Sequence, residues 1–253
     1  MSSLAGLSTS SFGDDLRVSG GTNDSRAIFI KKADRFLVTS RKDLDLYESL
    51  PVATYTVDID QRDGSFYLKQ VDNFEIGEKI YGDTKTQAER IFNSFRQRKG
   101  STGVLLAGEK GSGKTFLAKY LSVMAGQQGI PTIVVNQALH GDRFNAFIQS
   151  IVQPVVILFD EFEKVYRPLP HEQESQIRSF GSTEGSPNAN QDSVLTLLDG
   201  VYPADILFLL TVNDQEKITG TLRNRPGRIY YYLDFKGVTP EFIRECKFRN
   251  EQA

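Results

Sequence analysis

The chain has 253 residues, of which 39% are hydrophobic and 25% charged, so it can bury a sizeable core without disulfide staples. Its 30 Lys and Arg nearly balance 32 Asp and Glu, which argues against a nucleic-acid coat protein or a polybasic membrane binder. With 1 Cys and 2 His, a disulfide framework and a Cys/His zinc site are excluded. Because there is no secretory leader pattern and no apolar run of about 18 residues, we expect a cytoplasmic protein without a membrane span.

The first 72 residues differ in composition from the rest of the chain. Residues 1–27 are rich in Ser, Gly, Thr and Asp and predict a disordered tail, because they offer few large apolar groups. In residues 28–72, Tyr55 and Val57 alternate with polar residues ahead of an Asp-Gly pair at Gly64, which is typical of a β-hairpin. We therefore expect a small strand-containing module before the main domain.

Strands and helices alternate over residues 73–235. The expected helices span 84–99, 115–125, 143–152 and 193–198, and the expected strands span 103–107, 132–135, 155–159, 206–211 and 229–233. The strand at 155–159 is apolar throughout, as in a parallel strand that is covered on both faces. This alternation predicts an α/β fold with a parallel sheet. Residues 167–191 have the composition of a loop and are long for one, which favours a functional or disordered segment.

A glycine-rich segment, GEKGSGKT, matches the pattern G-x-x-x-x-G-K-[ST] between a predicted strand and a predicted helix. In this context backbone N–H groups and the helix N-terminus face phosphate oxygens. We expect Lys114 at the β- and γ-phosphates of a nucleotide and the Thr115 hydroxyl on Mg²⁺. The alternative is a glycine-rich turn with an exposed lysine. The predicted nucleotide-binding residues here are Gly108, Glu109, Lys110, Gly111, Ser112, Gly113, Lys114, Thr115 and Phe116.

Polar residues also follow two of the predicted strands. Asp160 and Glu161 end the strand at 155–159, at the edge of a parallel sheet where ligands bind. We expect Asp160 to hold Mg²⁺ and Glu161 to orient and deprotonate water. Asn213 follows the strand at 206–211 and could hydrogen-bond that water or the γ-phosphate. A solvated strand end and an Asn-Asp turn are the alternatives.

Three arginines, Arg223, Arg225 and Arg228, precede the last predicted strand. Their planar, permanently charged guanidinium groups suit phosphate. A solvated basic loop is the alternative.

In this order the motifs resemble those of the AAA family within the AAA+ ATPases. GEKGSGKT resembles the Walker A motif, VVILFDE the Walker B motif, SVLTLLDG the helix before the fourth strand, TVND sensor 1 and RNRPGR the arginine-finger segment. The resemblance covers residues from about 74 to 235. It implies a three-layer P-loop NTPase fold with a five-stranded parallel sheet in the order 5-1-4-3-2. FDEFEKVY and IYYYLDF resemble phage and bacterial members, which implies the host cytoplasm if the source is viral.

The resemblance assigns roles to individual residues. Asn213 corresponds to sensor 1, and Arg225 and Arg228 correspond to fingers that act on nucleotide held by a neighbouring subunit. Such fingers require a ring, usually a hexamer. Tyr81 lies where the family's adenine-contacting segment falls.

Three features depart from the family pattern, and one of them is the long segment 167–191, which is an unusual insertion. Residues 236–253 begin a helical lid that is truncated or minimal, whereas the family normally has several lid helices. The stretch Ala138–Gly141 has the glycine of a pore loop without its aromatic residue, so threading of a polypeptide is not predicted.

The function expected from these features is Mg-dependent ATP hydrolysis by an oligomer that remodels an unknown protein partner. An AAA+ protein of DNA replication, packaging or loading is the main alternative, and the near-neutral charge disfavours it. A kinase on the same scaffold is disfavoured by the carboxylate pair and the arginine segment. Glu161 and Asn213 argue against an assembly module that binds ATP without turnover.

Overall fold

The structure is a computed structural model, and it describes residues 27–32, 35–40, 44–77, 80, 82–166, 191–200, 202, 204–218 and 229–237. The chain forms two compact units, Met1–Glu48 and Ser49–Ala253. The predictions for residues 1–26, for 167–190 and for the lid beyond Gly237 lie outside the described residues. In the part of the chain that is described, no helix is long and apolar enough to cross a membrane.

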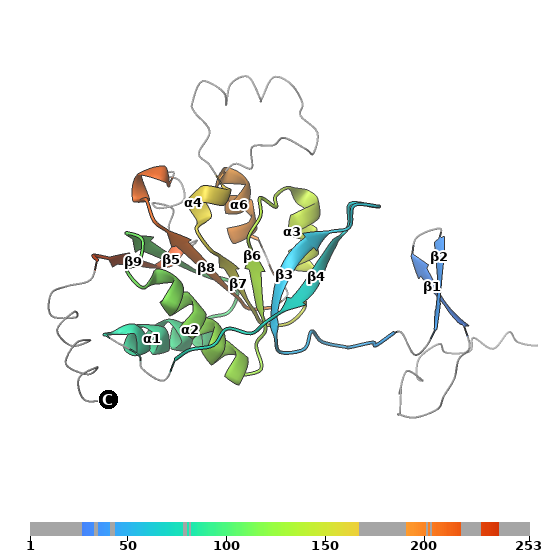
Figure 1. The fold of residues 1–253 in the computed structure, drawn as a ribbon, viewed down its shortest axis with the longest axis horizontal. Coiled ribbons are helices and arrows are strands. Elements are labelled where there is room, and N and C mark those ends of the chain that lie inside the picture. The colour runs from blue at the N-terminus through green and yellow to red at the C-terminus, as the bar shows by residue number, and fades with distance from the viewer. Residues whose placement is uncertain are drawn as a thin grey trace, which may run out of the picture. The chain divides into compact units, whose positions relative to one another are not determined.

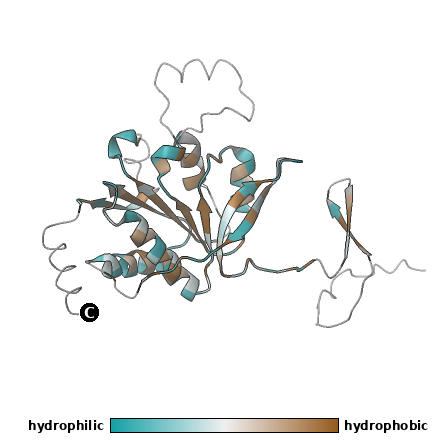
Figure 2. Cartoon of the chain, viewed as in Figure 1, coloured by the Kyte–Doolittle hydropathy of each residue, from teal (hydrophilic) through white to brown (hydrophobic). Residues whose placement is uncertain are grey.

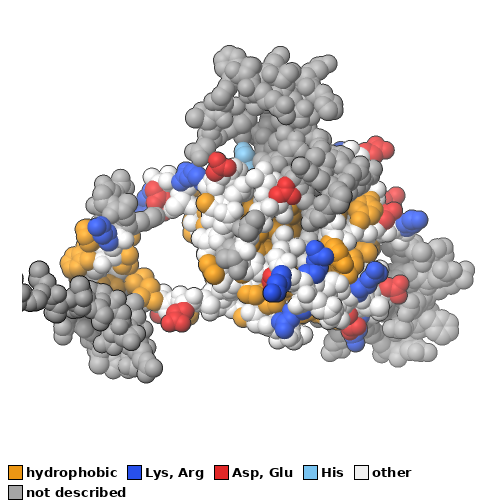
Figure 3. All heavy atoms as spheres, turned by 180° about the vertical axis from the view of Figure 1, so that it is seen from behind, with side chains coloured by type: hydrophobic (Ala, Val, Ile, Leu, Met, Phe, Trp, Pro, Cys, Tyr) orange, Lys and Arg blue, Asp and Glu red, His pale blue; other side chains and the backbone are white. Residues whose placement is uncertain are grey.

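The described part of the first unit contains an antiparallel hairpin of β1 (Ala27–Lys32) and β2 (Arg35–Ser40). Its large apolar side chains are exposed, including Phe29 at 67% and Val38 at 66%. Figure 3 shows hydrophobic side chains gathered on the visible face of this hairpin. Among the residues described in this unit none of the large apolar side chains is buried, and two strands alone are marginally stable in water.

The second unit is built on a seven-stranded sheet in the order β4-β3-β6-β7-β8-β5-β9 (Figure 1). Its strands are β3 (Thr54–Ile59), β4 (Phe66–Val71), β5 (Thr102–Gly108), β6 (Thr132–Val135), β7 (Val155–Phe159), β8 (Ile206–Val212) and β9 (Ile229–Phe235). All neighbours pair in parallel except β3 and β4. The last five strands in sequence carry the expected order 5-1-4-3-2, so this part of the prediction is confirmed.

The prediction of a five-stranded sheet is wrong, because the β3–β4 hairpin joins the same sheet. β3 pairs in parallel with β6, with Thr54 opposite Thr132 and Tyr55 opposite Ile133. Tyr55 and Val57 point into the core, as their alternation with polar residues indicated. That pattern identifies a half-buried strand but not its partner. By pairing with β6, the hairpin covers an edge that would otherwise expose unpaired backbone groups.

Helices cover both faces of the sheet, in the three layers expected. The helices are α1 (Thr84–Gln97), α2 (Lys114–Gln127), α3 (Asp142–Gln149), α4 (Phe162–Val165) and α6 (Gln191–Leu198). In Figure 1, α1 and α2 lie on one face and α3, α4 and α6 on the other. Alternate residues of each central strand serve the two cores: Ile157 packs with the α3 side and Leu158 with the α2 side. The central strands are accordingly hydrophobic along their length (Figure 2).

The described residues Tyr166 and Gln191, which lie on either side of 167–190 in the sequence, are in direct contact. The buried Gln191 side chain donates hydrogen bonds to the carbonyls of Tyr166 (3.1 Å) and Lys217 (2.6 Å). Tyr166 in turn donates to the carbonyl of Leu139 at 2.7 Å, in the stretch that departs from a pore-loop pattern. Leu139 is itself buried. The backbone of this stretch is therefore attached to the core.

Candidate active site

The glycine-rich loop connects the end of β5 to the start of α2. Gly108 and Gly113 have φ values of 141° and 102°, which side chains other than glycine rarely adopt. A Cβ on Gly108 would collide with the backbone carbonyl of Phe235 in β9. Gly113 is the N-cap of α2, so the helix begins at Lys114 with its first N–H groups facing the loop. The loop thus has the geometry that a phosphate cradle requires.

The Lys114 ammonium is enclosed by this loop. Its side chain is buried, and Nζ donates to the carbonyls of Gly108 and Glu109, both at 2.7 Å, and to the Ser112 hydroxyl at 3.4 Å. Burial lowers the pKa of Lys114, while the acids of the site, Glu163 first, act to raise it. The N–H groups of the Lys114 ammonium, which the motif predicts to bind phosphates, therefore donate to backbone oxygens of the loop in this structure.

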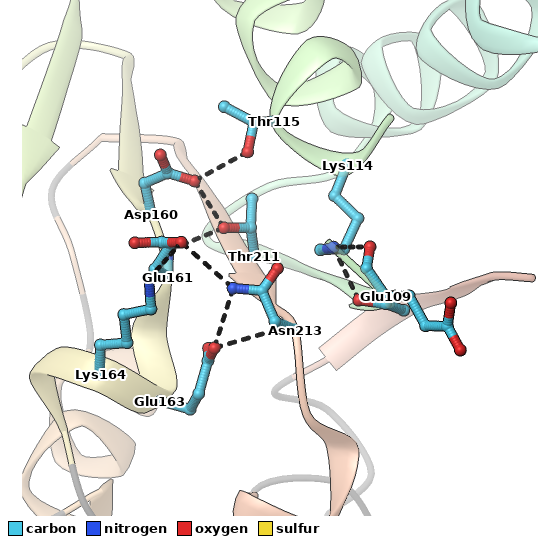
Figure 4. A network of polar contacts seen from close by, with 10 residues as sticks. Glu109, Lys114, Thr115, Asp160, Glu161, Glu163, Lys164, Thr211 and Asn213 are labelled. Carbon is cyan, nitrogen blue, oxygen red and sulfur yellow. Dashed lines mark hydrogen bonds and ion pairs between the residues drawn. The ribbon is translucent and has the colours of Figure 1, made fainter. Parts of the chain in front are cut away.

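The loop and the acidic strand end meet at one hydrogen bond (Figure 4). The Thr115 hydroxyl, in the first turn of α2, donates to Oδ1 of Asp160 at 3.1 Å, across 45 residues of sequence. Asp160 follows the last residue of β7 at the carboxyl edge of the sheet. Two sequence motifs that were expected to share one metal ion are thus in direct contact.

A threonine of β8 organises the backbone around Asp160. Thr211 is buried, and its hydroxyl donates to Oδ1 of Asp160 at 2.6 Å. The same hydroxyl accepts the backbone N–H of Glu161 at 2.8 Å. Glu161 needs such support because its φ is 50°, the one positive φ found for a non-glycine residue in the described ranges. Thr211 therefore fixes both acids from the neighbouring strand.

Asn213 lies between two glutamates, just beyond β8. Its side-chain amide donates to Oε1 of Glu163 at 3.0 Å and to Oε1 of Glu161 at 3.3 Å. Its backbone N–H donates to the same Glu163 oxygen at 3.2 Å. Glu163 is buried, and within the described residues its second carboxylate oxygen has no hydrogen-bond partner. Two bonds to one oxygen hold the Asn213 amide facing Glu161.

Glu161 also pairs with a lysine one turn further along α4. Lys164 Nζ lies 2.6 Å from Oε1 of Glu161. This hydrogen bond is the main reason that the pKa of Glu161 is lowered, with smaller contributions from Asn213 and from Lys110 on the glycine-rich loop. The carboxylate is consequently held in its charged form.

A cavity of about 570 Å³ opens beside these groups. It is lined by the loop residues Gly108 and Glu109, by Asn213 and by the end of β9. The volume falls within the range of small-molecule sites. The open space therefore adjoins both the glycine-rich loop and Asn213.

The donor set suits a magnesium ion. The Thr115 hydroxyl and the Asp160 carboxylate are hard oxygen ligands only 3.1 Å apart. Mg²⁺ typically binds one or two such protein ligands and completes its shell with water and substrate phosphates.

The structure brings together most of the residues predicted from the sequence. The glycine-rich loop, Asp160, Glu161 and Asn213 share one edge of the sheet, and Phe116 is half-buried in the first turn of α2. Tyr81, Arg223, Arg225 and Arg228 lie outside the described residues.

Three site residues were missed by the sequence reasoning. Thr211 had a signal, because it is the one polar side chain in the otherwise apolar β8. Lys164 stands three residues after Glu161, which is the spacing of helical neighbours. Glu163 gave no signal, since its contact is with Asn213 at a separation of 50 residues.

Comparison with known proteins agrees with this geometry. The model of the "ATPase family associated with various cellular activities (AAA)" matches residues 104–235, which is more than half of the chain. An ATP-dependent zinc metalloprotease FtsH of Syntrophus aciditrophicus is 28% identical over 50% of this chain and 17% of its own length. A proteasome-associated ATPase of Frankia casuarinae is 23% identical over 92% of this chain and 43% of its own. Protein mac-1 of Caenorhabditis elegans is 30% identical over 54% of this chain and 17% of its own.

The chain spans less than half the length of these curated relatives. The family match begins in β5 and ends with β9, so it includes the glycine-rich loop, both acids and Asn213. On this match the chain belongs to the AAA family of ATPases, within the AAA+ superfamily.

Proposed function

We propose that this chain binds Mg–ATP at the described sheet edge, hydrolyses it, and uses the energy within a ring of identical subunits to remodel a protein partner. The observation that carries the proposal is the 3.1 Å hydrogen bond from Thr115 to Asp160. It joins the end of the phosphate-binding loop to the acid pair, as a shared magnesium–triphosphate requires.

When ATP binds, phosphate oxygens would replace backbone carbonyl oxygens as the hydrogen-bond acceptors of the Lys114 ammonium. The Lys114 ammonium, now bonded to the Gly108 and Glu109 carbonyls, is placed to turn to the β- and γ-phosphates. Thr115 and Asp160 would hold Mg²⁺, directly or through water. When bound, the ion neutralises charge on the phosphate oxygens. Backbone N–H groups of the loop and of the first turn of α2 supply the remaining contacts.

Hydrolysis requires a base beside the γ-phosphate, and Glu161 is the best candidate. Its carboxylate would accept a proton from water as the water oxygen bonds to the γ-phosphorus and the bond to the β–γ bridging oxygen breaks. Asn213 donates to Glu161 at 3.3 Å and would orient the water and the γ-phosphate. Glu161 would therefore accept the proton and Asn213 would orient the reacting groups. Lys114 would stabilise the negative charge that develops on the phosphates.

The proposal of a ring and of a protein client is based on the family membership of the chain. We propose that Arg225 and Arg228 reach the nucleotide of the adjacent subunit and spread the charge of the transition state there. The names of the relatives include a protease and a proteasome-associated ATPase, which supports a protein client.

Glu161→Gln tests the proposal. We expect ATP binding to be kept and turnover to fall by about 10²–10⁴-fold, because the amide cannot accept the proton. Binding is measured by calorimetry and turnover by phosphate release, at several protein concentrations. If the arginines act between subunits, wild-type turnover per chain should rise with protein concentration.

Glu89→Gln is the matched control, because Glu89 is an exposed glutamate on α1. It should bind and hydrolyse ATP like the wild type. Hydrolysis by Glu161→Gln at the wild-type rate would refute the assignment of the base. Absence of ATP binding by the wild type would refute the proposed function.

A further inference from the structure

Positive charge is concentrated in α1 and at its C-terminal end. The whole sequence carries a formal charge of −2, but residues 84–99 hold one acid, Glu89, and five basic residues. The basic residues are Lys85, Arg90, Arg96, Arg98 and Lys99. Among the residues that the structure describes, none of these five forms an ion pair. The near-neutral net charge of the chain therefore does not reveal a locally basic surface.

Two of the arginines lie over tyrosine rings of β9, the last strand in the order of the sheet. Cζ of Arg98 is 4.1 Å from the centre of the Tyr230 ring, and Cζ of Arg90 is 5.5 Å from that of the Tyr231 ring. Ser94 lies between the two arginines in α1, and its hydroxyl is 2.6 Å from the Tyr231 hydroxyl. Because residues four apart share one face of a helix, Arg90, Ser94 and Arg98 form one row beside β9.

The Tyr230 ring is accessible to a ligand. Tyr230 is 51% exposed, although the Arg98 guanidinium lies over its ring. The register between β9 and β5 skips Tyr230, so it is the extra residue of a bulge, which redirects a side chain. Nε of Arg98 is buried and has no hydrogen-bond partner in the described part of the chain. A planar ligand can therefore extend the Arg98–Tyr230 stack.

A purely structural role explains only part of this arrangement. Cations at the C-terminal end of a helix interact favourably with its dipole, which accounts for Arg96, Arg98 and Lys99. The dipole does not account for Arg90 in the middle of α1, or for an exposed aromatic ring beside the cations.

Single-stranded nucleic acid matches both features of this surface. Its phosphates suit the planar, permanently charged guanidinium groups, and its unpaired bases stack on aromatic rings. An acidic peptide would use the cations alone. The bases of a duplex are already stacked on one another.

We propose that the α1–β9 surface, which consists of Arg90, Ser94, Arg98, Tyr230 and Tyr231, binds single-stranded nucleic acid. Phosphates lie at the two arginines, and a base stacks on Tyr230. The helix α1 precedes residues 104–235, to which the family match is limited. The surface takes no part in the catalytic machinery proposed above, so the inference goes beyond the proposed function and does not depend on it.

The experiment measures binding of a fluorescently labelled oligothymidylate to the full chain by anisotropy, without ATP. About 20 nucleotides suffice, because one such site covers roughly 4–16. We expect Tyr230→Leu to weaken binding about 5- to 150-fold, which corresponds to roughly 1–3 kcal/mol for the loss of one stacked base. Tyr230→Phe retains the ring and should bind like the wild type.

Tyr67→Leu is the matched control for the aromatic ring. Tyr67 is 43% exposed on β4, at the other end of the strand order, where its neighbours include Asp58 and Asp60. This variant should bind the oligonucleotide like the wild type. Thermal unfolding of all variants reports whether a change in affinity reflects altered folding.

Arg90→Gln tests the electrostatic part of the proposal. The affinity of a protein for single strands falls with salt in proportion to the number of phosphates it contacts. For one lost contact we expect the slope of log Kd against log salt concentration to decrease by about 0.7. Arg96→Gln is the control, because Arg96 is also exposed but lies six residues further along α1, outside the row that faces β9. Its slope should stay closer to that of the wild type.

Several results would overturn the inference. They are no binding of oligothymidylate by the wild type at low salt, equally tight binding of a duplex of the same length, and wild-type affinity of Tyr230→Leu. Equally tight binding of polyglutamate would make the surface a site for acidic peptides instead. If Tyr230→Leu fails to fold, an unchanged salt slope in Arg90→Gln refutes the proposal. None of these results bears on ATP hydrolysis, which Glu161→Gln tests separately.

Discussion

The two halves of the proposed nucleotide site satisfy their polar groups in different ways. In the glycine-rich half, the Lys114 ammonium bonds to the backbone carbonyls of Gly108 and Glu109, which are only six and five residues away. In the acidic half, Asp160 and Glu161 are bonded to side chains of β8 and its end, about 50 residues away. The first half depends on the local path of the backbone, and the second depends on the packing of two strands. Binding should therefore be lost by changes in the first half, and catalysis by changes in the second.

The largest expected effect on ATP binding tests the glycine-rich half. Lys114→Ala removes the cation that would meet the β- and γ-phosphates. We expect ATP affinity to fall by about 10- to 100-fold, since hydrogen bonds between charged groups contribute about 1.5–3 kcal/mol. Calorimetric titration of ATP in the presence of Mg²⁺ measures this loss.

Lys119→Ala is the control for this change, because Lys119 lies on the same helix with its ammonium 5.5 Å from the centre of the Phe74 ring. It should bind ATP like the wild type. Equal affinity of Lys114→Ala and the wild type would mean that the loop does not bind the phosphates, and the contrast between the two halves would fail.

A smaller effect should appear in the acidic half. Thr211→Val keeps the shape of the side chain but removes the hydroxyl that serves Asp160 and the Glu161 N–H. Leaving these partners unpaired should cost about 1–3 kcal/mol of unfolding free energy, measured in urea. Hydrolysis should fall because both acids lose their support, whereas ATP affinity should change less than in Lys114→Ala.

Thr211→Ser restores the hydroxyl and should recover most of the stability and turnover. If Thr211→Val lowers ATP affinity as much as Lys114→Ala does, the two halves do not divide binding from catalysis.

The same contrast explains what the sequence could predict. The glycine-rich loop is contiguous, so its spacing identified Lys114 and Thr115 directly. Asp160 and Asn213 were recognised because strands that end at one edge bring their following residues together. Thr211, Glu163 and Lys164 were missed because their partners are set by which strands are neighbours and by the path of α4, which a motif does not encode.

In the fold, too, local strand patterns could be predicted from the sequence, whereas contacts between distant segments could not. The alternation at Tyr55 and Val57 correctly indicated a half-buried strand, but pairing with β6 is a contact between distant segments and was not predicted. The β1–β2 hairpin has short apolar runs in its strands as well, yet Phe29 and Val38 remain exposed. Alternation and the Asp-Gly pair predicted the β3–β4 hairpin. In the described residues, only that hairpin is paired with the seven-stranded sheet.

The most direct test of the central claim is an experimental structure of the Glu161→Gln protein with ATP and Mg²⁺. The account predicts one metal ion in contact with the Thr115 hydroxyl and the Asp160 carboxylate, directly or through water, and phosphates within hydrogen-bond distance of Lys114. A nucleotide bound away from Lys114, or a metal ion that approaches neither Thr115 nor Asp160, would contradict it.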